Sequence, residues 1–365
     1  MLIELNIKWT TVFLLVTAIS VSQRFKSCNK NEKNKAPALV GTPLVQQIPA
    51  TFPSPLYNFK DNRLTEEGFT LGRKLFYDSN LSKDGNFSCG SCHQQYAAFS
   101  TFDHPLSHGF NNQFSSRNAP ALFNEAWQKE FNHDGGINNI EVQPLAPITA
   151  HNEMAETLEN VVSKIRKDTS YARYFKAAFG DGSVNSQRIL KALAQFTVSL
   201  VSADSKYDKV KRGEASFLPY EQHGYELFQT NCASCHPEPM FTDYSYRNTG
   251  LPKDSSLNDI GRMKITNDAG DSLKFKVPSL RNVAVTSPYM HDGRFWFLSQ
   301  CIRHYRDGIK DSPTLDSSLV KRIPLSEKDI VEINSFLRTL TDSSFLKNQR
   351  FADPENKRIF SPDRH

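Results

Sequence analysis

One five-residue pattern, Cys-x-x-Cys-His, occurs twice in this chain of 365 residues and constrains its fold more than any other feature. It covers Cys89–His93 in the first half and Cys232–His236 in the second. Two thiols three positions apart can reach the two vinyl groups of one porphyrin, and the imidazole that follows then lies beneath the iron as an axial ligand. A redox disulfide or half of a zinc site also uses paired cysteines, but neither requires a histidine directly after both pairs. The repeat therefore predicts two covalently bound haem c groups, held through Cys89, Cys92, His93, Cys232, Cys235 and His236.

The amino-terminal 35 residues have the character of an export leader. Residues 9–21 form an apolar run that follows Lys8, is short for a membrane span and gives way to polar sequence, which is typical of a signal peptide. Cys28 precedes a polar stretch and suggests a lipid anchor, although residues 24–26 (Arg-Phe-Lys) fit the lipoprotein pattern poorly. Because haem c is attached outside the cytoplasm, we expect residues 1–35 to be a signal peptide or lipoprotein leader of a periplasmic or cell-envelope protein.

A second repeat accompanies the two haem motifs. Gly72-x-x-Leu75-Phe76 precedes the first cysteine pair, and Gly224-x-x-Leu227-Phe228 precedes the second. A small residue one turn before an apolar pair lets another helix approach closely, so the chain is expected to contain two copies of one helical domain. The expected organisation is a Pro-rich linker over 36–57, an N-terminal haem domain over 58–205, a C-terminal haem domain over 206–345 and a tail over 346–365.

Amphipathic periodicity predicts helices and no convincing strands. A helix is expected over residues 65–77, and apolar faces recur at 158–165, at 189–200 and after Ser326, where Ser-x-x-Asp is a variant of the capping box. The long segments between them are rich in Gly, Pro, Asn and Asp, and such segments in a helical domain usually wrap around a large group. The expected fold class is all-α, with two cytochrome c-like domains that each hold one covalent haem c.

The charge pattern argues against nucleic-acid binding. The formal net charge is +5, and Lys and Arg are scattered among Asp and Glu, as on an ordinary solvated surface. We therefore expect no nucleic-acid partner, although a mild positive excess can steer an acidic protein.

The residues alone leave the sixth ligand of each iron open. His104 and His108 follow the first motif. The candidates after the second motif are Met240, Met263, Met290, His291, His304 and Tyr305.

A series of further motifs follows both haem sites in register. After the first come Ser107–Gly109, Arg117–Pro120, Asp134–Gly136 and Gln143–Met154; after the second come Phe275–Val283 and Ser287–Gly293. With these motifs the chain, over about residues 58–342, resembles the bacterial di-haem cytochrome c peroxidase family, which includes the di-haem maturase of methylamine dehydrogenase.

The resemblance implies roles around the first haem. His93 is its proximal ligand, and His108 matches the removable sixth ligand of the peroxidases. Gln143 and Glu153 match the distal pair: a carboxylate can move a proton from the iron-bound oxygen of peroxide to the outer one, while an amide holds the oxygens.

For the second haem, the resemblance implies His236 and a sixth ligand fourteen residues after His291, which is Tyr305. Many peroxidases have Met there, whereas the maturase has Tyr; a phenolate favours ferric iron and a thioether favours ferrous iron. Met290 is the alternative ligand. Adjacent His304 cannot face the same iron as Tyr305, because neighbouring helical residues point about 100° apart.

The family also implies a calcium ion, held by the side-chain oxygen of Asn118 and the carbonyl groups of Thr286 and Pro288, since calcium prefers hard oxygen ligands. Tyr305 is the main departure from the simple peroxidase pattern. His133 is a second, since it stands where a tryptophan usually lies between the haems.

The expected function is reduction of hydrogen peroxide to water. The resemblance implies a small electron donor such as a mono-haem cytochrome c or a cupredoxin, and it is compatible with a homodimer. The alternatives are a maturase-like oxidase that acts on a protein or organic substrate, which Tyr305 favours, and a di-haem electron carrier. An electron carrier has no use for Gln143 and Glu153.

Overall fold

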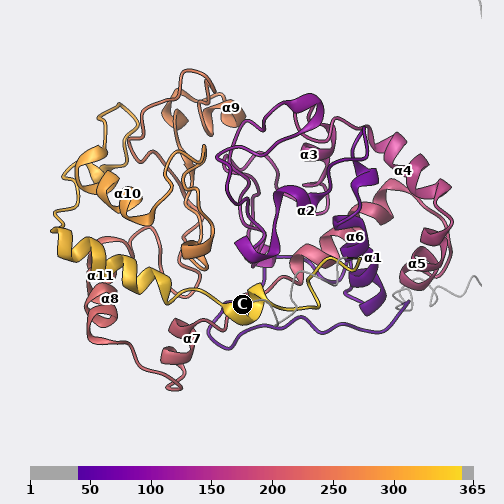
Figure 1. The fold of residues 1–365 in the computed structure, drawn as a ribbon, viewed down its shortest axis with the longest axis horizontal. Helices are drawn as coiled ribbons and strands as arrows, with labels where there is room; N and C mark the ends of the chain where they lie inside the picture. The colour runs from indigo at the N-terminus through magenta and orange to yellow at the C-terminus, as the bar shows by residue number, and fades with distance from the viewer. Residues whose placement is uncertain (1–39, 356–365) are drawn as a thin grey trace, which may run out of the picture. The chain divides into compact units, whose positions relative to one another are not determined.

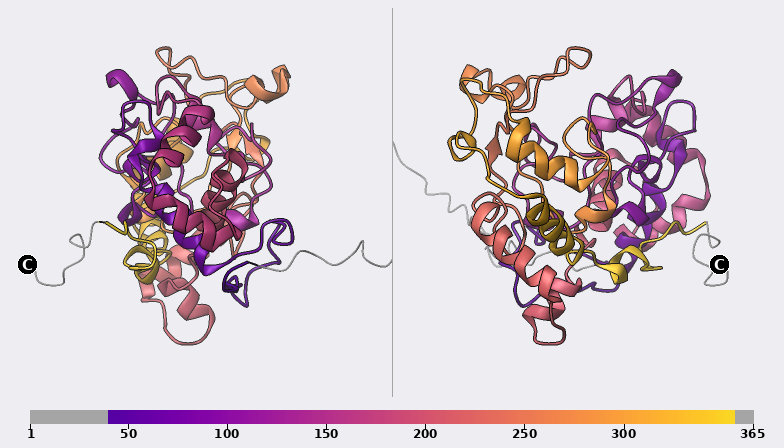
Figure 2. Two further views of the ribbon diagram at one scale, coloured as in Figure 1. Left: turned by 90° about the vertical axis from the view of Figure 1, so that its right-hand side faces the viewer. Right: turned by 60° about the vertical axis from the view of Figure 1, so that its left-hand side comes forward.

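The computed structural model describes residues 40–355, and the regular structure of these residues is almost entirely helical (Figure 1). Its α-helices are α1 (Glu66–Phe76), α2 (Cys89–Cys92), α3 (Leu145–Thr149), α4 (Leu158–Lys167), α5 (Ser170–Phe179), α6 (Ser186–Val198), α7 (Lys206–Lys211), α8 (Pro219–Asn231), α9 (Met263–Thr266), α10 (Leu298–Arg303), α11 (Glu327–Arg338) and α12 (Ser343–Leu346). Two short strands, β1 (Tyr246–Arg247) and β2 (Phe275–Lys276), pair in antiparallel fashion. Long irregular segments separate the helices in both views of Figure 2. The structure therefore confirms the expected helix-rich class.

Several of the sequence-based expectations concern residues outside this range. The leader, including Cys28, and residues 356–365 of the expected tail are not among the described residues. Within residues 40–355, none of the helices has the length and apolar character needed to cross a membrane.

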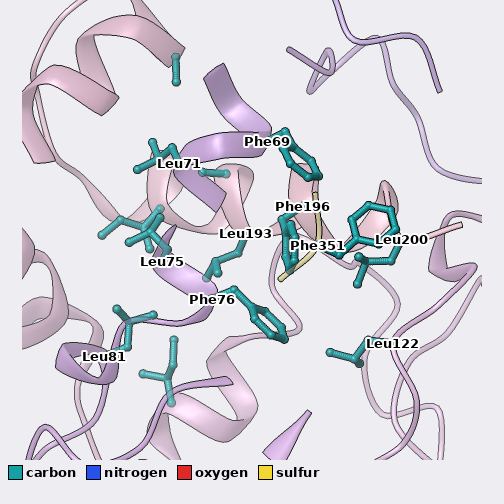
Figure 3. Packing of buried hydrophobic residues seen from close by; sticks show 14 of the residues in the cluster. Phe69, Leu71, Leu75, Phe76, Leu81, Leu122, Leu193, Phe196, Leu200 and Phe351 are labelled. Carbon is teal, nitrogen blue, oxygen red and sulfur yellow. The ribbon is translucent and has the colours of Figure 1, made fainter. Parts of the chain in front are cut away.

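The N-terminal half, residues 58–205, is organised around the crossing of α1 and α6 (Figure 3). A Cβ atom at Gly72 would overlap the carbonyl oxygen of Ala192, so only glycine allows these backbones to lie so close. Phe76 and Phe196 meet at this crossing with ring centroids 5.0 Å apart. The Thr65 side chain caps α1 by accepting a hydrogen bond from the amide of Gly68, as expected for a helix that begins near residue 65.

The C-terminal half, residues 206–345, repeats this arrangement with α8 and α11, which lie against each other in Figure 1. A Cβ atom at Gly224 would overlap the carbonyl oxygen of Glu332. Phe228 and Phe336 pack beside the crossing with their centroids 5.1 Å apart. Ser326 and Asp329 form the expected capping box at the start of α11.

The C-terminal segment, residues 342–355, packs onto the N-terminal half. Phe345 and Phe351 belong to the same buried cluster as Phe69 of α1. The Tyr77 hydroxyl donates to the carbonyl oxygen of Phe351 at 2.8 Å, and Gln95 Nε2 donates to that of Asn348 at 2.8 Å. The first ten residues of the expected tail, 346–355, therefore cover the region next to the first haem motif.

Residues 40–57, within the expected linker, contain no helix and lie along the N-terminal half. Gln46 Nε2 donates to the carbonyl oxygen of Val198 at 3.0 Å. Phe52 packs edge-on against Trp127 with a centroid distance of 5.2 Å, and the Trp127 indole donates to the carbonyl oxygen of Pro53 at 2.7 Å.

Candidate haem and peroxide sites

The first Cys-x-x-Cys-His motif forms α2 and the residue that follows it. Both thiols are free, and the His93 Nδ1 atom lies 2.8 Å from the carbonyl oxygen of Phe99. A carbonyl can only accept, so Nδ1 carries the proton and Nε2 keeps its lone pair. Nε2 has no hydrogen-bond partner within the described part of the chain. Histidines that bind metals commonly donate their other ring N–H to a backbone carbonyl in this way.

The second motif has the same local chemistry. Cys232 caps the end of α8, and the His236 Nδ1 atom lies 3.0 Å from the carbonyl oxygen of Phe241. Burial lowers the pKa of both motif histidines, so each is a neutral imidazole, which is the form that ligates a metal.

The buried thiols distinguish these motifs from a redox-active cysteine pair. Burial raises the pKa of Cys89 and of Cys232 to about 12. Reactive pairs instead have a thiolate of lowered pKa. In each motif a thiol of raised pKa lies beside an imidazole that a backbone carbonyl orients, and this arrangement fits the attachment of haem c.

Glu153 lies close to the first motif. Burial raises the pKa of its carboxyl group and is the only cause of that shift, and no ion-pair or hydrogen-bond partner reaches the carboxylate within residues 40–355. Its charge raises the pKa of Cys92, which places the two side chains within electrostatic range of each other. The structure therefore brings a partly buried acid, unpaired within residues 40–355, to the side of the first haem motif.

Gln143 and Glu153 lie at opposite ends of α3. Gln143 lies directly before Pro144 and α3, while the Glu153 amide closes the turn after α3 by donating to the carbonyl oxygen of Ala150 at 3.0 Å. The Gln143 side chain makes one long hydrogen bond, 3.4 Å from Nε2 to Asn132 Oδ1.

His108 lies on an exposed turn next to Glu153. The backbone amide of Phe110 donates to the carbonyl oxygen of Glu153 at 2.7 Å, which joins this turn to the acid. The His108 ring is exposed and packs between the rings of His104 and Phe114, with centroid distances of 4.8 and 4.7 Å. In this conformation the imidazole is directed to the surface, and its role as a haem ligand stays a prediction.

Tyr305 lies in a π-helical turn, η8 (His304–Gly308), directly after α10. Such turns are rare and frequently occur at functional sites. Burial raises the pKa of the Tyr305 phenol, and the nearby cysteines, including Cys232 and Cys235, raise it further. The side chain therefore lies beside the second haem motif.

The competing ligands have other contacts. His304 is buried and its Nε2 atom lies 2.8 Å from the carbonyl oxygen of Thr249. Met290 lies in a turn that contacts the N-terminal half, where the amide of Asn118 donates to the carbonyl oxygen of His291 at 2.8 Å.

The predicted calcium ligands lie in neighbouring segments from the two halves. Asn118 donates from Nδ2 to the carbonyl oxygen of Pro105 at 3.0 Å, and its backbone pairs with the turn that follows Pro288. The hydroxyl of Thr286 donates to the carbonyl oxygen of Val283 at 3.2 Å, so it is engaged locally. Within residues 40–355, no three or more His, Cys, Asp or Glu side chains form a group that could hold a metal. The predicted calcium ligands are of another kind, namely the side-chain amide oxygen of Asn118 and backbone carbonyl oxygens.

His133 occupies a contact between the halves. Its Nε2 atom lies 2.9 Å from the carbonyl oxygen of Asn118, and its own carbonyl oxygen accepts from the amide of Lys276 at 2.7 Å. Burial lowers the pKa of His133 to about 4, so the ring is neutral. The imidazole therefore bonds within its own half, and the backbone carbonyl of His133 makes the contact with Lys276 of the other half.

Sequence reasoning missed the ion pairs that surround this contact. Arg117 donates to Asp134 at 2.6 Å within its own half and to Asp259 of the other half at 2.6 and 2.8 Å. Lys276 donates to Gln128 and to the carbonyl oxygen of Glu130. Arg117 belongs to a recognised motif, but nothing in the sequence indicates its partner 142 residues away.

Comparison with known proteins agrees with this geometry. The sequence model of the family described as di-haem cytochrome c peroxidase matches residues 66–216. The chain is 34% identical over 298 residues to the methylamine utilization protein MauG of Methylorubrum extorquens, covering 80% of this chain and 82% of that protein. It is also 34% identical to the cytochrome c551 peroxidase of Nitrosomonas europaea, covering 74% of this chain and 79% of that protein.

Solved structures give the same result. A MauG-like protein associated with microbial copper homeostasis superimposes with a TM-score of 0.79 at 32% identity, covering 85% of this chain and 99% of that one. The di-haem peroxidase BthA of Burkholderia thailandensis, at 22% identity and a TM-score of 0.71, shares the fold.

The chain therefore belongs to the di-haem cytochrome c peroxidase family, which includes cytochrome c peroxidases and MauG proteins. Membership implies two haem c groups, in agreement with the two motifs.

Proposed function

We propose that this protein reduces hydrogen peroxide to water at the N-terminal half, with electrons from a small donor such as a mono-haem cytochrome c or a cupredoxin. The observation that carries the proposal is Glu153, a partly buried carboxyl group beside Cys92 whose pKa burial raises and which no ion-pair or hydrogen-bond partner reaches within residues 40–355. An electron carrier has no need of such an acid.

The side chains of the first site have separate roles in peroxide reduction. The haem groups supply the redox chemistry, since iron exchanges single electrons and can bind a ligand where an axial position is open. Glu153 accepts a proton from one peroxide oxygen and returns it to the other, a transfer that suits a carboxyl group whose pKa is raised towards the working pH. Gln143 supplies an amide that orients the oxygens. His108 would be the removable ligand of the N-terminal haem, and its imidazole is exposed in this structure.

The accompanying assignments form part of the proposal. The N-terminal haem is held by Cys89, Cys92 and His93 in residues 58–205, and the C-terminal haem by Cys232, Cys235 and His236 in residues 206–345. Residues 1–35 direct the protein to the periplasm or cell envelope, and residues 36–57 and 346–365 are the linker and tail. Calcium binds at Asn118, Thr286 and Pro288.

A steady-state assay tests the proposal. Purified holoprotein is mixed with hydrogen peroxide and a reduced mono-haem cytochrome c, and oxidation of the donor is followed by absorbance. Glu153→Gln keeps the side-chain shape but removes the base, so turnover should fall by about 10²-fold at unchanged haem content. Glu159→Gln, at an exposed acid of α4, is the matched control and should retain full turnover. Retention of activity within twofold in Glu153→Gln would show that the assigned acid takes no part.

A maturase-like oxidase is the second candidate function. The observation that favours it is the partly buried Tyr305 in η8, beside Cys232 and Cys235, because a phenolate ligand stabilises ferric iron. An enzyme of this kind would consume peroxide while oxidising a protein or organic substrate and would use the small donor poorly. The same assay, run once with the small electron-donor protein and once with a protein or organic substrate as the reductant, distinguishes a peroxidase from a maturase-like oxidase.

A further inference from the structure

Two exposed histidines, His104 and His108, lie side by side next to the first haem motif. Their ring centroids are 4.8 Å apart and their planes are inclined by 78°. The haem site described above uses only His108, so it does not account for the position of His104.

The separation of the two rings is that of an ordinary edge-to-face contact, and two ligands of one metal ion can have the same separation. An imidazole nitrogen lies about 2.0 Å from a bound metal and the ring centre about 1.2 Å further, so metal and ring centre are about 3.2 Å apart. Two rings in adjacent positions of a square-planar site then have centres about 4.5 Å apart, and at the tetrahedral angle about 5.2 Å. The observed 4.8 Å lies between these values.

A second observation concerns the carboxylate of Asp103. Its Oδ1 atom lies 2.6 Å from His104 Nδ1, which fixes the proton on Nδ1 and leaves the Nε2 lone pair available. A carboxylate behind an imidazole is the usual orienting partner of a metal-binding histidine. The side chain of His104 is 46% exposed, so an ion can reach it from solvent.

The backbone holds both histidines in place. Pro105 follows His104, and its carbonyl oxygen accepts a hydrogen bond from Asn118 at 3.0 Å. On the other side, the amide of Ser115 donates to the carbonyl oxygen of Ser107 at 2.9 Å, which closes the turn that carries His108. In this conformation the two rings are already adjacent, so a metal that binds them does not have to bring them together.

We propose that His104 and His108 form a surface site for a divalent transition-metal ion, with copper(II) bound most tightly. Imidazole suits copper and zinc, and copper(II) leads the order of affinities for nitrogen ligands. No third His, Cys, Asp or Glu joins the pair within the described residues, so water completes the coordination, as tetragonal copper(II) accepts.

The site has a consequence for peroxide reduction that rests on the proposed function. One imidazole nitrogen cannot ligate two metals, so an ion bound at this site keeps His108 on the surface and away from the first haem. The ion therefore acts as an activator that opens the peroxide site.

Calorimetric titration of the metal-stripped holoprotein with CuCl2 tests the binding. Wild type should bind one ion at this site, and copper paramagnetic resonance should show hyperfine coupling to two imidazole nitrogens. His104→Gln should abolish this coupling and weaken binding, and Asp103→Asn should weaken binding about tenfold because the ligand loses its orienting partner. His223→Gln, at a histidine paired with Glu332 far from this turn, is the control and should leave the titration unchanged. Equal affinity in wild type and His104→Gln, or no binding in wild type, overturns the site.

Zinc(II), which undergoes no redox change, tests whether an ion at this site activates peroxide reduction. ZnCl2 should raise the initial rate of peroxide reduction by the fully ferric wild type several-fold and have no effect on His104→Gln. Zinc that binds without changing the rate overturns the activating role. Binding is measured without peroxide, so a protein that binds copper through both histidines but never reduces peroxide would contradict only the proposed function.

Discussion

Glu153 and Glu156 are three residues apart, yet the structure gives them opposite chemistry. Lys164 forms an ion pair with Glu156 at 2.5 Å, and although burial by itself raises the pKa of Glu156, this ion pair and hydrogen bonds from Thr157 and Asn160 together lower it. Glu153 has no such partner, so burial raises its pKa. The sequence places both acids before a helix and cannot distinguish them by periodicity. Only the resemblance to a family identified Glu153 as the candidate, and its lack of a partner now supports that assignment on physical grounds.

At the second haem motif, substitutions of Tyr305 and Met290 show which of these two side chains ligates the haem iron. Tyr305→Phe removes the ligating oxygen while keeping the ring, so the second haem should change its absorption spectrum and its reduction potential should rise. Met290→Leu should leave both nearly unchanged, because the turn of Met290 contacts the N-terminal half. Optical redox titration measures both effects.

The ferric spectrum supplies the control for this experiment. Ligation by Met290 would give wild type a weak near-infrared sulfur-to-iron band that Met290→Leu removes. That outcome would show that the count of fourteen residues from His291 misplaces the ligand, and it would favour a conventional peroxidase over a maturase-like enzyme.

At the scale of elements, two glycines set the helix crossings that surround the haem motifs. The repeated pattern Gly-x-x-Leu-Phe predicted close helix approach in both halves, and the structure confirms it at Gly72 and Gly224. The partner atoms are backbone carbonyl oxygens of Ala192 and Glu332, which cannot turn aside as a side chain can.

Gly72→Ala should therefore destabilise the protein although alanine is the better helix former. The added methyl group forces α1 and α6 apart, and overpacking of this kind costs about 1–3 kcal/mol or more, against about 1 kcal/mol gained in helix propensity. Denaturant unfolding of the holoprotein measures the change. Gly182→Ala is the matched control, because its methyl group would meet Ala172 at an ordinary 3.4 Å. Equal stability of the two variants would contradict the packing argument.

Element prediction from sequence succeeded where periodicity is strong and failed where geometry depends on distant residues. The helices α1, α4, α6 and α11 lie where their apolar faces indicate. The π-helical turn η8 has no sequence signature, because its hydrogen-bond pattern depends on packing of α10 rather than on residue preference.

At the scale of the whole molecule, the halves are joined by contacts between residues far apart in the sequence. Arg117 bridges Asp134 and Asp259, and residues 342–355 lie on the N-terminal half, where Phe345 and Phe351 are buried. No local pattern predicts either contact, since each depends on how the completed halves meet. The predicted repeat of helices, by contrast, depends only on nearby residues and was foreseeable.

Calcium removal tests whether the oxygen atoms of Asn118, Thr286 and Pro288 hold an ion. These residues come from both halves, so stripping the ion with a chelator should loosen the contact between the halves and slow peroxide turnover. Asn118→Ala should reproduce the effect, and added calcium should restore wild type but not the variant. If elemental analysis finds no calcium and the chelator does not change the rate of peroxide turnover, the calcium prediction is wrong.

A stopped-flow measurement of stoichiometry shows whether this di-haem protein reduces peroxide with external electrons. Holoprotein carrying two haems per chain is mixed with limiting hydrogen peroxide and excess reduced mono-haem cytochrome c, with and without one-electron pre-reduction. We expect two donor molecules to be oxidised for each peroxide consumed, with no oxygen released, and Glu153→Gln to lose this reaction. Peroxide that remains intact under both conditions, or that disappears without oxidation of the donor, would contradict the proposed function.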